Sequence, residues 1–358
     1  MLRKLPRSVL VLLVVVVVAL VLISLYSGLS GPSTSGSWIS AYSYPLKAAG
    51  VPGVVGQACV ESAGYAYCVG GEDFNDDPTS SVYYAPISSS GVGNWTLSAN
   101  PYPMAIVFQA CATSSGYVYC VGGTKDSQGD DTAASYYAPL SPAGAGPWVA
   151  STPYPVAVDA LSCVTAAGGI YCVGGENETA GTSASAVITN SVWFAPVSAQ
   201  GIGAWSQSVG YPAGIYYPNC TGAGSYVYCV GGENAKDDPQ NATYYSYVTS
   251  SGMGAWAAAP GYPIQTIGES CATSYSVVYC VGGFQSGGAT TAAVYSASVT
   301  SSGMEQWKPA PSYPLGVATD CVAGEGYVYC IGGYSSSTGE PTGDSYYAVL
   351  NGGTSGSS

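Results

Sequence analysis

The sequence contains no histidine, and its only arginines are Arg3 and Arg7. Without histidine, a Ser-His-Asp catalytic triad cannot be assembled. Seven basic residues in 358 also leave too little positive charge for a nucleic-acid-binding face, because such faces neutralise phosphates with Lys and Arg. Charged residues make up 8% of the chain and hydrophobic residues 47%, which excludes an intrinsically disordered protein. We therefore expect a folded protein with a net charge of −13 and no nucleic-acid partner.

The few basic residues that do occur are concentrated at the N-terminus. Arg3, Lys4 and Arg7 precede residues 9–25, which are apolar except for one serine. This run is just long enough to cross a bilayer. The positive-inside rule places the N-terminus in the cytoplasm and the remainder outside the cell. Two alternatives are a cleaved secretory signal and a pilin-like leader that is cut near Ser8.

The N-terminal pattern and the composition of the chain define five segments. We expect a cytoplasmic tip at residues 1–7, a transmembrane signal-anchor helix at 8–26 and a flexible, Gly/Ser-rich stalk at 27–37. Residues 38–350 form the folded ectodomain, and residues 351–358 a disordered Gly/Ser tail. The predicted location is the cell membrane, with a single span and an extracellular ectodomain.

The ectodomain is built from six copies of one pattern, a short apolar segment that ends in Cys-Val-Gly-Gly or Cys-Ile-Gly-Gly. A repeat period of about fifty residues is typical of propellers and solenoids. The copies lie at residues 65–71, 117–123, 170–175, 226–232, 277–283 and 327–333.

The second copy shows the strand signals of one repeat. Residues 105–112 and 117–121 predict two strands joined by a Ser-Ser-Gly turn. A polar loop leads to a third strand at residues 135–140, and Trp148 opens a fourth. Four antiparallel strands in each repeat are the composition of one propeller blade.

This pattern resembles the kelch repeat, in which a strand ends in Gly-Gly, a Tyr lies in the next strand and a Trp follows about twenty-five residues on. The resemblance covers residues 38–350 and implies an all-β, six-bladed kelch-like β-propeller. The paired cysteines and the Tyr-Pro after each Trp depart from the common kelch pattern. They suggest an extracellular, membrane-anchored archaeal or other prokaryotic branch of that family.

The positions of the repeat tryptophans predict how the ring closes. Trp95, Trp148, Trp205, Trp256 and Trp307 each follow one of the first five Gly-Gly pairs, and no Trp follows the sixth. The missing residue is Trp38, at the front of the repeat region. The N-terminal segment should therefore supply the outer strand of the last blade, which leaves no unpaired edge between the first and last blades.

The twelve cysteines form six pairs, each with eight residues between the partners. In every repeat the two cysteines fall on adjacent antiparallel strands, so we expect six disulfides within blades. Zinc binding would need closer Cys-x2-Cys spacing or His partners, and the sequence has neither. Disulfides indicate an oxidising compartment or a hyperthermophile's cell. The predicted pairs are Cys59–Cys68, Cys111–Cys120, Cys163–Cys172, Cys220–Cys229, Cys271–Cys280 and Cys321–Cys330.

Fourteen of the twenty carboxylates lie between a Gly-Gly pair and the third strand. These loops should share one face with the Tyr-Pro turns, so one face should be acidic. Solvation of the loop tips explains such charges, and a binding site for cations or a basic partner is the functional alternative. Asp73, Asn75 and Asp77 have the alternate-oxygen spacing of a calcium loop, but Pro78 replaces the usual following residues. No cofactor is expected beyond calcium at this loop.

The tyrosines of the Tyr-Pro turns are candidates for a binding face, because turns lie at the surface. Packing into the core is the alternative. The candidates, which could ring the mouth of the channel, are Tyr44, Tyr102, Tyr154, Tyr211, Tyr262 and Tyr313.

Asn177, Asn241 and Asn94 are candidate N-glycosylation sites, because each begins an Asn-x-Thr sequon. A fourth sequon at Asn219 should be buried, because Asn219 precedes a bonded cysteine on an innermost strand.

The resemblance brings two kinds of enzyme into consideration, and the residues that the sequence lacks argue against both. Copper oxidases of the kelch type need His ligands, and sialidase propellers need an Arg cluster. A paired-carboxylate glycosidase is the chemistry that the composition leaves open. Asp159, Glu269 and Asp320 precede a cysteine at different offsets, so the repeat does not gather them at one point, and we expect no enzyme.

These observations predict a membrane-anchored extracellular propeller that acts as a binding or adhesion module. It would recognise a protein or glycan partner through its loop face. The alternative is homo-assembly into a surface layer or filament, with the apolar N-terminal helix as anchor or filament core. Recognition predicts a preformed polar pocket at the channel mouth, whereas assembly predicts an apolar patch on the rim.

Overall fold

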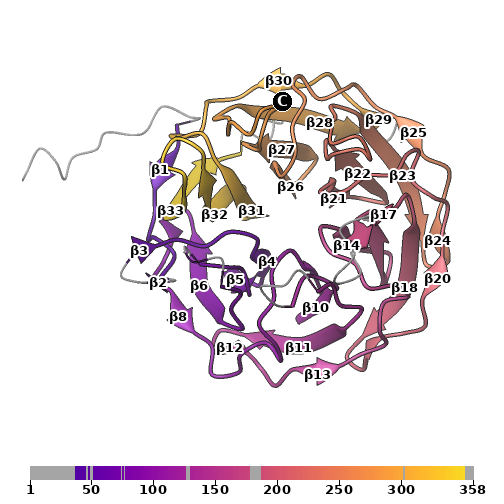
Figure 1. Ribbon diagram of the computed structural model, residues 1–358, viewed down its shortest axis with the longest axis horizontal. Helices are drawn as coiled ribbons and strands as arrows, with labels where there is room; N and C mark the ends of the chain where they lie inside the picture. Colours follow the sequence, from indigo (N-terminus) through magenta and orange to yellow (C-terminus); the bar gives the residue numbers. More distant parts are fainter. Residues whose placement is uncertain are drawn as a thin grey trace, which may run out of the picture. The chain divides into compact units, whose positions relative to one another are not determined.

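The computed structural model describes residues 37–45, 47–48, 51–73, 75, 77–125, 130–177, 187–300 and 303–350. The unit that begins at Trp38 is a ring of six antiparallel sheets around a central channel (Figure 1). This confirms the predicted six-bladed β-propeller. Within the described residues, no helix is long and apolar enough to cross a membrane. The predicted transmembrane segment 8–26 and the tail 351–358 lie outside them.

Each blade has four strands in order from the channel to the rim. The first strands are β4 (Ala58–Ser62), β9 (Ala110–Ser114), β14 (Ser162–Ala166), β21 (Asn219–Ala223), β26 (Ser270–Ser274) and β31 (Ala318–Gly324). The second strands are β5 (Tyr65–Val69), β10 (Tyr117–Val121), β15 (Gly169–Val173), β22 (Tyr226–Val230), β27 (Val277–Val281) and β32 (Tyr327–Ser335). The third strands are β6 (Val82–Ser88), β11 (Ser135–Ser141), β18 (Val192–Ser198), β23 (Thr243–Thr249), β28 (Val294–Thr300) and β33 (Glu340–Val349). The outer strands are β8 (Thr96–Leu97), β13 (Val149–Ala150), β20 (Ser206–Gln207), β25 (Ala257–Ala258), β30 (Lys308–Pro309) and β1 (Ile39–Ser40).

Short strands complete the loops of the ring. Five of them pair with the end of a third strand: β7 (Gly91–Val92), β12 (Gly144–Ala145), β19 (Gly201–Ile202), β24 (Gly252–Met253) and β29 (Gly303–Met304). Two further hairpins are formed by β2 (Lys47–Ala48) with β3 (Val51–Pro52) and by β16 (Glu176–Asn177) with β17 (Val187–Ile188).

The second strands are the best-buried part of each blade. In β10, every residue after Tyr117 is buried, including Tyr119 and Cys120. A strand in this position is covered on both faces by the neighbouring blades, so its sequence is a continuous apolar run rather than an alternating one. The hydroxyl groups of these strands also join blades, since Tyr119 donates to the Ser198 carbonyl of the next blade at 2.9 Å.

The repeated Gly-Gly pairs are required by a close approach between blades. Gly122 and Gly123 both have positive φ angles, 67° and 98°. A Cβ atom on Gly122 would lie 2.4 Å from the Val158 carbonyl oxygen of the next blade. The same carbonyl accepts the Gly123 N–H at 2.8 Å. Only glycine provides both the left-handed backbone and the space for this contact.

The ring closes as predicted from the missing tryptophan. Strand β1 pairs with β33, with Ile39 opposite Tyr347 and Ser40 opposite Tyr346. The Ala41 N–H donates to the Ser345 carbonyl at 2.8 Å and extends this pairing. The last blade therefore joins three C-terminal strands to one N-terminal strand (Figure 1).

The structure joins all twelve cysteines in the six predicted pairs, each linking the first and second strand of one blade. The two cysteines of a pair are direct register partners, as Cys111 and Cys120 show. Their Cα atoms lie 4.0 to 4.1 Å apart because opposed residues of antiparallel strands come close together.

Candidate functional site

The Tyr-Pro tyrosines do not form an exposed ring, so the prediction of a tyrosine binding face is wrong. Their exposed fractions are only 1 to 3%. Each ring packs edge-on against a repeat tryptophan, at centroid distances of 4.8 to 5.0 Å. The residues concerned are Tyr44, Tyr102, Tyr154, Tyr211, Tyr262 and Tyr313.

These tyrosines fasten each blade to the next one. Tyr102 follows the outer strand of the first blade, and its N–H donates to the Ser80 carbonyl of that blade at 2.8 Å. Its ring instead packs against Trp148 and Tyr136 of the second blade. The turn is at the surface, but burial of an aromatic side chain between two blades is the stronger driving force. In the third blade, Trp193 takes the position that Tyr136 has in the second blade and packs in the same cluster as Tyr154.

The buried hydroxyl group of Tyr44 has no hydrogen-bond partner in the described part of the chain. We expect Tyr44→Phe to leave the free energy of unfolding unchanged or raise it by about 1 kcal/mol, because an unsatisfied polar group is removed. The matched control is Tyr67→Phe, since the Tyr67 hydroxyl donates to the Ser141 carbonyl at 2.8 Å. That variant should lose about 1 kcal/mol in denaturant unfolding. A loss in Tyr44→Phe as large as the control's would contradict this prediction.

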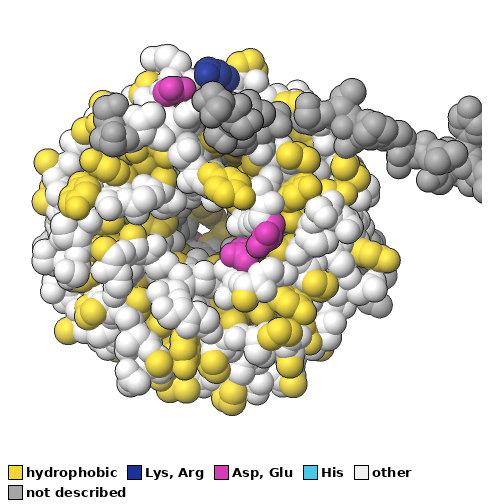
Figure 2. Space-filling model, turned by 180° about the vertical axis from the view of Figure 1, so that it is seen from behind, with side chains coloured by type: hydrophobic (Ala, Val, Ile, Leu, Met, Phe, Trp, Pro, Cys, Tyr) yellow, Lys and Arg dark blue, Asp and Glu magenta, His cyan; other side chains and the backbone are white. Residues whose placement is uncertain are grey.

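The central channel contains a cavity of about 860 Å³ that is lined by residues of all six blades. Its wall consists of the first strands and the segments just before them, together with residues that follow Gly-Gly pairs, such as Glu72 and Tyr334. Five aromatic residues also line it: Phe108, Tyr216, Tyr217, Phe284 and Tyr334. The opening is visible from the opposite side in Figure 2, on a face with few charged side chains.

Two aromatic residues occupy strained positions in this wall. Phe108 and Tyr217 both lie three residues before the first cysteine of their repeats, with φ angles of 58° and 49°. Left-handed backbone is rare for bulky side chains and costs about 1–3 kcal/mol. Three of the four equivalent residues in the other repeats, Gly56, Ala160 and Gly268, also have positive φ, and Ala318 does not. This pair was not predicted, although a bulky residue at a position that is glycine or alanine in the other repeats is a signal in the sequence.

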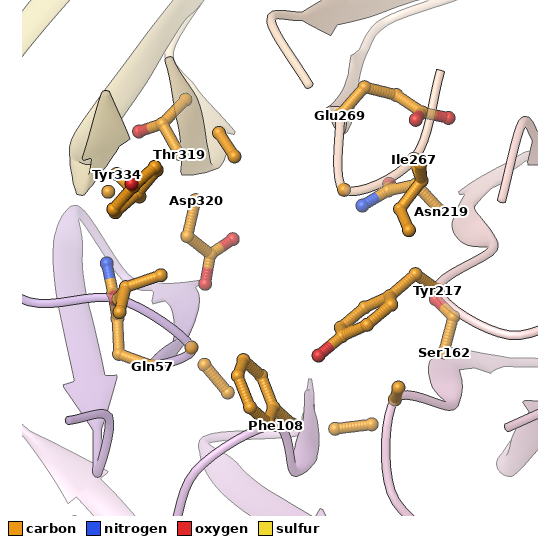
Figure 3. A pocket seen from close by; sticks show the side chains of 18 of the residues that line it. Gln57, Phe108, Ser162, Tyr217, Asn219, Ile267, Glu269, Thr319, Asp320 and Tyr334 are labelled. Atoms are coloured by element: carbon orange, nitrogen blue, oxygen red, sulfur yellow. The ribbon is translucent and has the colours of Figure 1, made fainter. Parts of the chain in front are cut away.

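The strained backbone brings the two rings together in the channel. The Phe108 and Tyr217 rings meet edge-to-face at 5.5 Å. Figure 3 shows the Tyr217 hydroxyl pointing into the cavity, close to the Phe108 ring. A backbone ladder holds them, because Phe108 donates to Gly56, Ala160 donates to Phe108, and Tyr217 donates to Ala160. This arrangement offers aromatic faces and a hydroxyl group to a ligand that enters the channel.

A second repeated contact places polar groups around the channel. In four blades the residue before the first cysteine accepts the N–H of the first cysteine in the following blade. The contacts are Ser162 with Cys220 at 3.0 Å, Asn219 with Cys271 at 2.9 Å, Ser270 with Cys321 at 2.8 Å and Asp320 with Cys59 at 2.5 Å.

Asp320 is the ionisable member of this set. Figure 3 shows its carboxyl group pointing into the cavity. Desolvation raises its pKa to about 7, although hydrogen bonds from Cys59, Cys321 and Ser270 oppose the shift. The charge of the channel wall therefore changes near neutral pH. The equivalent residues of the first two blades are Ala58 and Ala110, which cannot accept a hydrogen bond through their side chains.

Carboxylates from several blades lie around the paired tyrosines Tyr216 and Tyr217. Burial raises the pKa of Tyr216, and Glu233, Glu176 and Asp159 raise it further. The Glu233 carboxyl group also accepts a hydrogen bond from the Tyr216 hydroxyl. Burial is the main cause of the raised pKa of Tyr217 as well, followed by Asp159. The two tyrosines of the cavity wall therefore lie in acidic surroundings.

The three carboxyl groups weighed for glycosidase chemistry have separate surroundings. Asp159 accepts the Thr124 hydroxyl at 3.1 Å, and Asp320 accepts the Cys59 N–H. Glu269 is only 2% exposed, and Figure 3 shows its carboxyl group directed into the wall rather than the cavity.

The predicted calcium loop is folded as a turn. The Asp73 carboxylate accepts the Asn75 N–H at 2.8 Å, and the Asp73 N–H donates to the Asp77 carbonyl at 3.3 Å. Among the described residues there is no group of three or more His, Cys, Asp or Glu side chains placed to hold a metal ion. Asp76, between these residues, lies outside the described part.

The three glycosylation candidates differ in their surroundings. Asn94 and Asn241 are exposed. Asn177 lies in strand β16, where its side-chain amide donates to the Ala157 carbonyl. Asn219 is half-buried in the channel wall.

Comparisons with known proteins identify the fold and no closer relationship. No protein family model matches the sequence, and no curated protein matches it. The chain is similar to a solved structure described as "Structure of YjhT", with a TM-score of 0.66 and 15% sequence identity. The match covers 85% of this chain and 95% of that one. In total, 599 solved chains match this structure. A fold that so many chains share does not by itself specify a ligand.

Proposed function

We propose that this protein is a membrane-anchored, extracellular recognition or adhesion module. It binds a protein or glycan partner at the mouth of its channel, on the face that carries the loops after the Gly-Gly pairs. The observation that carries the proposal is the preformed cavity of about 860 Å³ with Phe108 and Tyr217 held in its wall at a conformational cost. Strain of this kind persists where the surrounding structure imposes it and is concentrated at functional sites. Flat aromatic faces beside hydroxyl, amide and carboxyl groups suit a sugar or a polar peptide.

The location rests on different observations. Six disulfides favour an oxidising, extracellular environment. The apolar segment 9–25 supports a membrane anchor, and exposed Asn94 and Asn241 support glycosylation. The Gly-Gly, Tyr and Trp placement supports a relationship to kelch repeats.

The test is a substitution that removes the aromatic pair without damaging the fold. Phe108→Gly and Tyr217→Gly introduce the residue that the first and fifth repeats already carry at this position. Loss of the ring contacts lowers the stability of each variant, and relief of the backbone strain raises it. Because the two effects partly cancel, we expect the free energy of unfolding to change by no more than about 1–2 kcal/mol. Binding of full-length protein in mild detergent to a glycan array and to cell-surface extracts should fall at least tenfold.

The matched control is Tyr275→Gly. Tyr275 also has a positive φ, 54°, but it is 78% exposed in the turn between β26 and β27, outside the cavity wall. This variant should keep full binding. Equal binding by the wild type and both cavity variants would exclude the channel mouth as the binding site.

The second candidate function is a structural subunit of a surface layer or filament. The outer strands favour it, because β8 and β13 expose Leu97 and Val149 at 56% and 46% on a short strand edge. Size measurement and imaging of the detergent-extracted protein separate the two functions. Sheets or fibres would support assembly, and a monodisperse monomer would support recognition.

A further inference from the structure

A repeated contact links the residue two before the first cysteine to the preceding blade. In the second blade, the Gln109 amide donates to the Val69 carbonyl, just before the Gly-Gly pair of the first blade, at 2.7 Å. In the first blade, Gln57 donates in the same way to Ile331 of the last blade at 2.9 Å. Both side chains are at least nine-tenths buried. The donor is essential here because the partner is a carbonyl oxygen, which can only accept.

The fifth blade has a glutamate at this position. Glu269 is 2% exposed, and neither of its carboxyl oxygens has a hydrogen-bond partner in the described structure. Its carboxyl group lies over Gly231, where a Cβ atom would be 2.2 Å from Oε1. The Gln109 amide lies over Gly70 in the same way, with Nε2 2.9 Å from the corresponding Cβ position. Glu269 therefore has the placement of a glutamine that donates to the residue before the glycine.

A carboxylate cannot make this contact, because an ionised carboxyl group only accepts hydrogen bonds. Facing a carbonyl oxygen, it would leave a buried charge unpaired. The neutral acid carries an O–H group that can donate as the glutamine amide does. We propose that Glu269 is a neutral carboxylic acid whose O–H group donates a hydrogen bond to the Val230 carbonyl and forms a proton-dependent latch between the fourth and fifth blades.

Among the described residues, the only group that favours the ionised form is the backbone N–H of Glu269 itself. Burial raises the pKa of Glu269 well above its usual range, and no charged neighbour contributes. The titratable groups that face it are Tyr211 and Tyr262, from the turns on either side of the fourth blade. Burial raises the pKa of both phenols, so both are neutral in acidic and neutral solution.

The sign of the pH dependence follows from this shift. The folded protein binds the Glu269 proton more tightly than the unfolded chain, whose pKa is near the usual value of 4.5. The latch is therefore complete below that pH, and its contribution is lost as the pH rises through the folded pKa. The Glu269 contact therefore stabilises the ring most in acid.

The experiment compares thermal unfolding of the full-length wild type, Glu269→Gln and Gln57→Glu at about pH 3 and pH 8. The glutamine amide replaces the acid O–H with a donor that does not titrate. Glu269→Gln should match the wild type at the lower pH and unfold about 2–5 °C higher at the upper pH. Gln57→Glu installs the same acid in the first blade, so it should match the wild type in acid and unfold at a lower temperature at pH 8. Asp320 titrates in both the wild type and Glu269→Gln and lies away from Glu269, so it cancels in that comparison, which carries the test.

An infrared measurement gives a second readout that does not depend on stability. The folded wild type at neutral pH should show the carbonyl band of a protonated carboxylic acid, and this band should be weaker by one group in Glu269→Gln. Two results would overturn the latch: a Glu269→Gln variant less stable than wild type at pH 8, or infrared spectra at neutral pH that are identical in the two proteins.

Discussion

Reduction of the six disulfides is expected to abolish cooperative folding of this protein at room temperature. Each bond closes a short loop and, in the chain-entropy model, contributes about 2–3 kcal/mol. The bonds lie in six different blades, so their contributions should be roughly additive. Their sum is comparable to the total stability of a typical domain, which is about 5–15 kcal/mol. The far-ultraviolet and fluorescence signals of the reduced protein should therefore match those of the denatured state.

The measurement is urea unfolding of the oxidised protein and of protein that has been reduced while denatured and then refolded under reductant. The second cysteine of each pair is fully buried, so the native protein should resist reduction until it unfolds. A single-blade control, in which Cys111 and Cys120 are both replaced by alanine, should lose about 2–3 kcal/mol and still fold. If the fully reduced protein unfolds cooperatively at the same urea concentration as the oxidised form, the disulfides are not what stabilises the ring.

Replacement of Trp38 by alanine is expected to open the ring at one seam. Trp38 packs against Tyr313 at 4.8 Å, and its indole N–H donates to the Pro311 carbonyl at 2.9 Å. Loss of these contacts should cost about 3 kcal/mol. Strand β1 has only two paired residues and no covalent connection to the rest of its blade, so it should detach. Hydrogen exchange of the β33 amides should then become at least tenfold faster.

The control for this prediction is Trp256→Ala. Trp256 makes the same contacts in the fourth blade, with Tyr211 at 4.9 Å and the Val209 carbonyl at 3.2 Å. Its stability loss should be similar, but the chain connects β23 to β25 within one blade, so exchange of the third strand should change little. Equal exchange rates for the third strands of both variants would show that the seam is no weaker than the other blades.

Residues that recur in every repeat could be placed from the sequence, whereas residues that depart from the repeat could not. The Gly-Gly pairs and paired cysteines are repeated, and repetition allowed each strand and disulfide to be placed. Phe108, Tyr217 and Glu269 are departures from the repeat, and their roles depend on contacts with other blades. The tyrosines of the Tyr-Pro turns were misplaced for a related reason, since a turn at the surface can direct its side chain inward.

The number of blades, the order of strands, the disulfide partners and the closure by Trp38 could all be predicted from the amino-acid sequence. These properties are local or periodic, because strand alternation, glycine pairs and nine-residue cysteine separations are encoded within single repeats. The direction in which each side chain points, toward a neighbouring blade, the channel or solvent, could be seen only in the folded structure. That choice buried Tyr44 and its equivalents, directed Phe108 and Tyr217 into the channel and placed Glu269 over Gly231. Each of these positions is fixed by packing against a residue of another repeat, and no single repeat contains that contact.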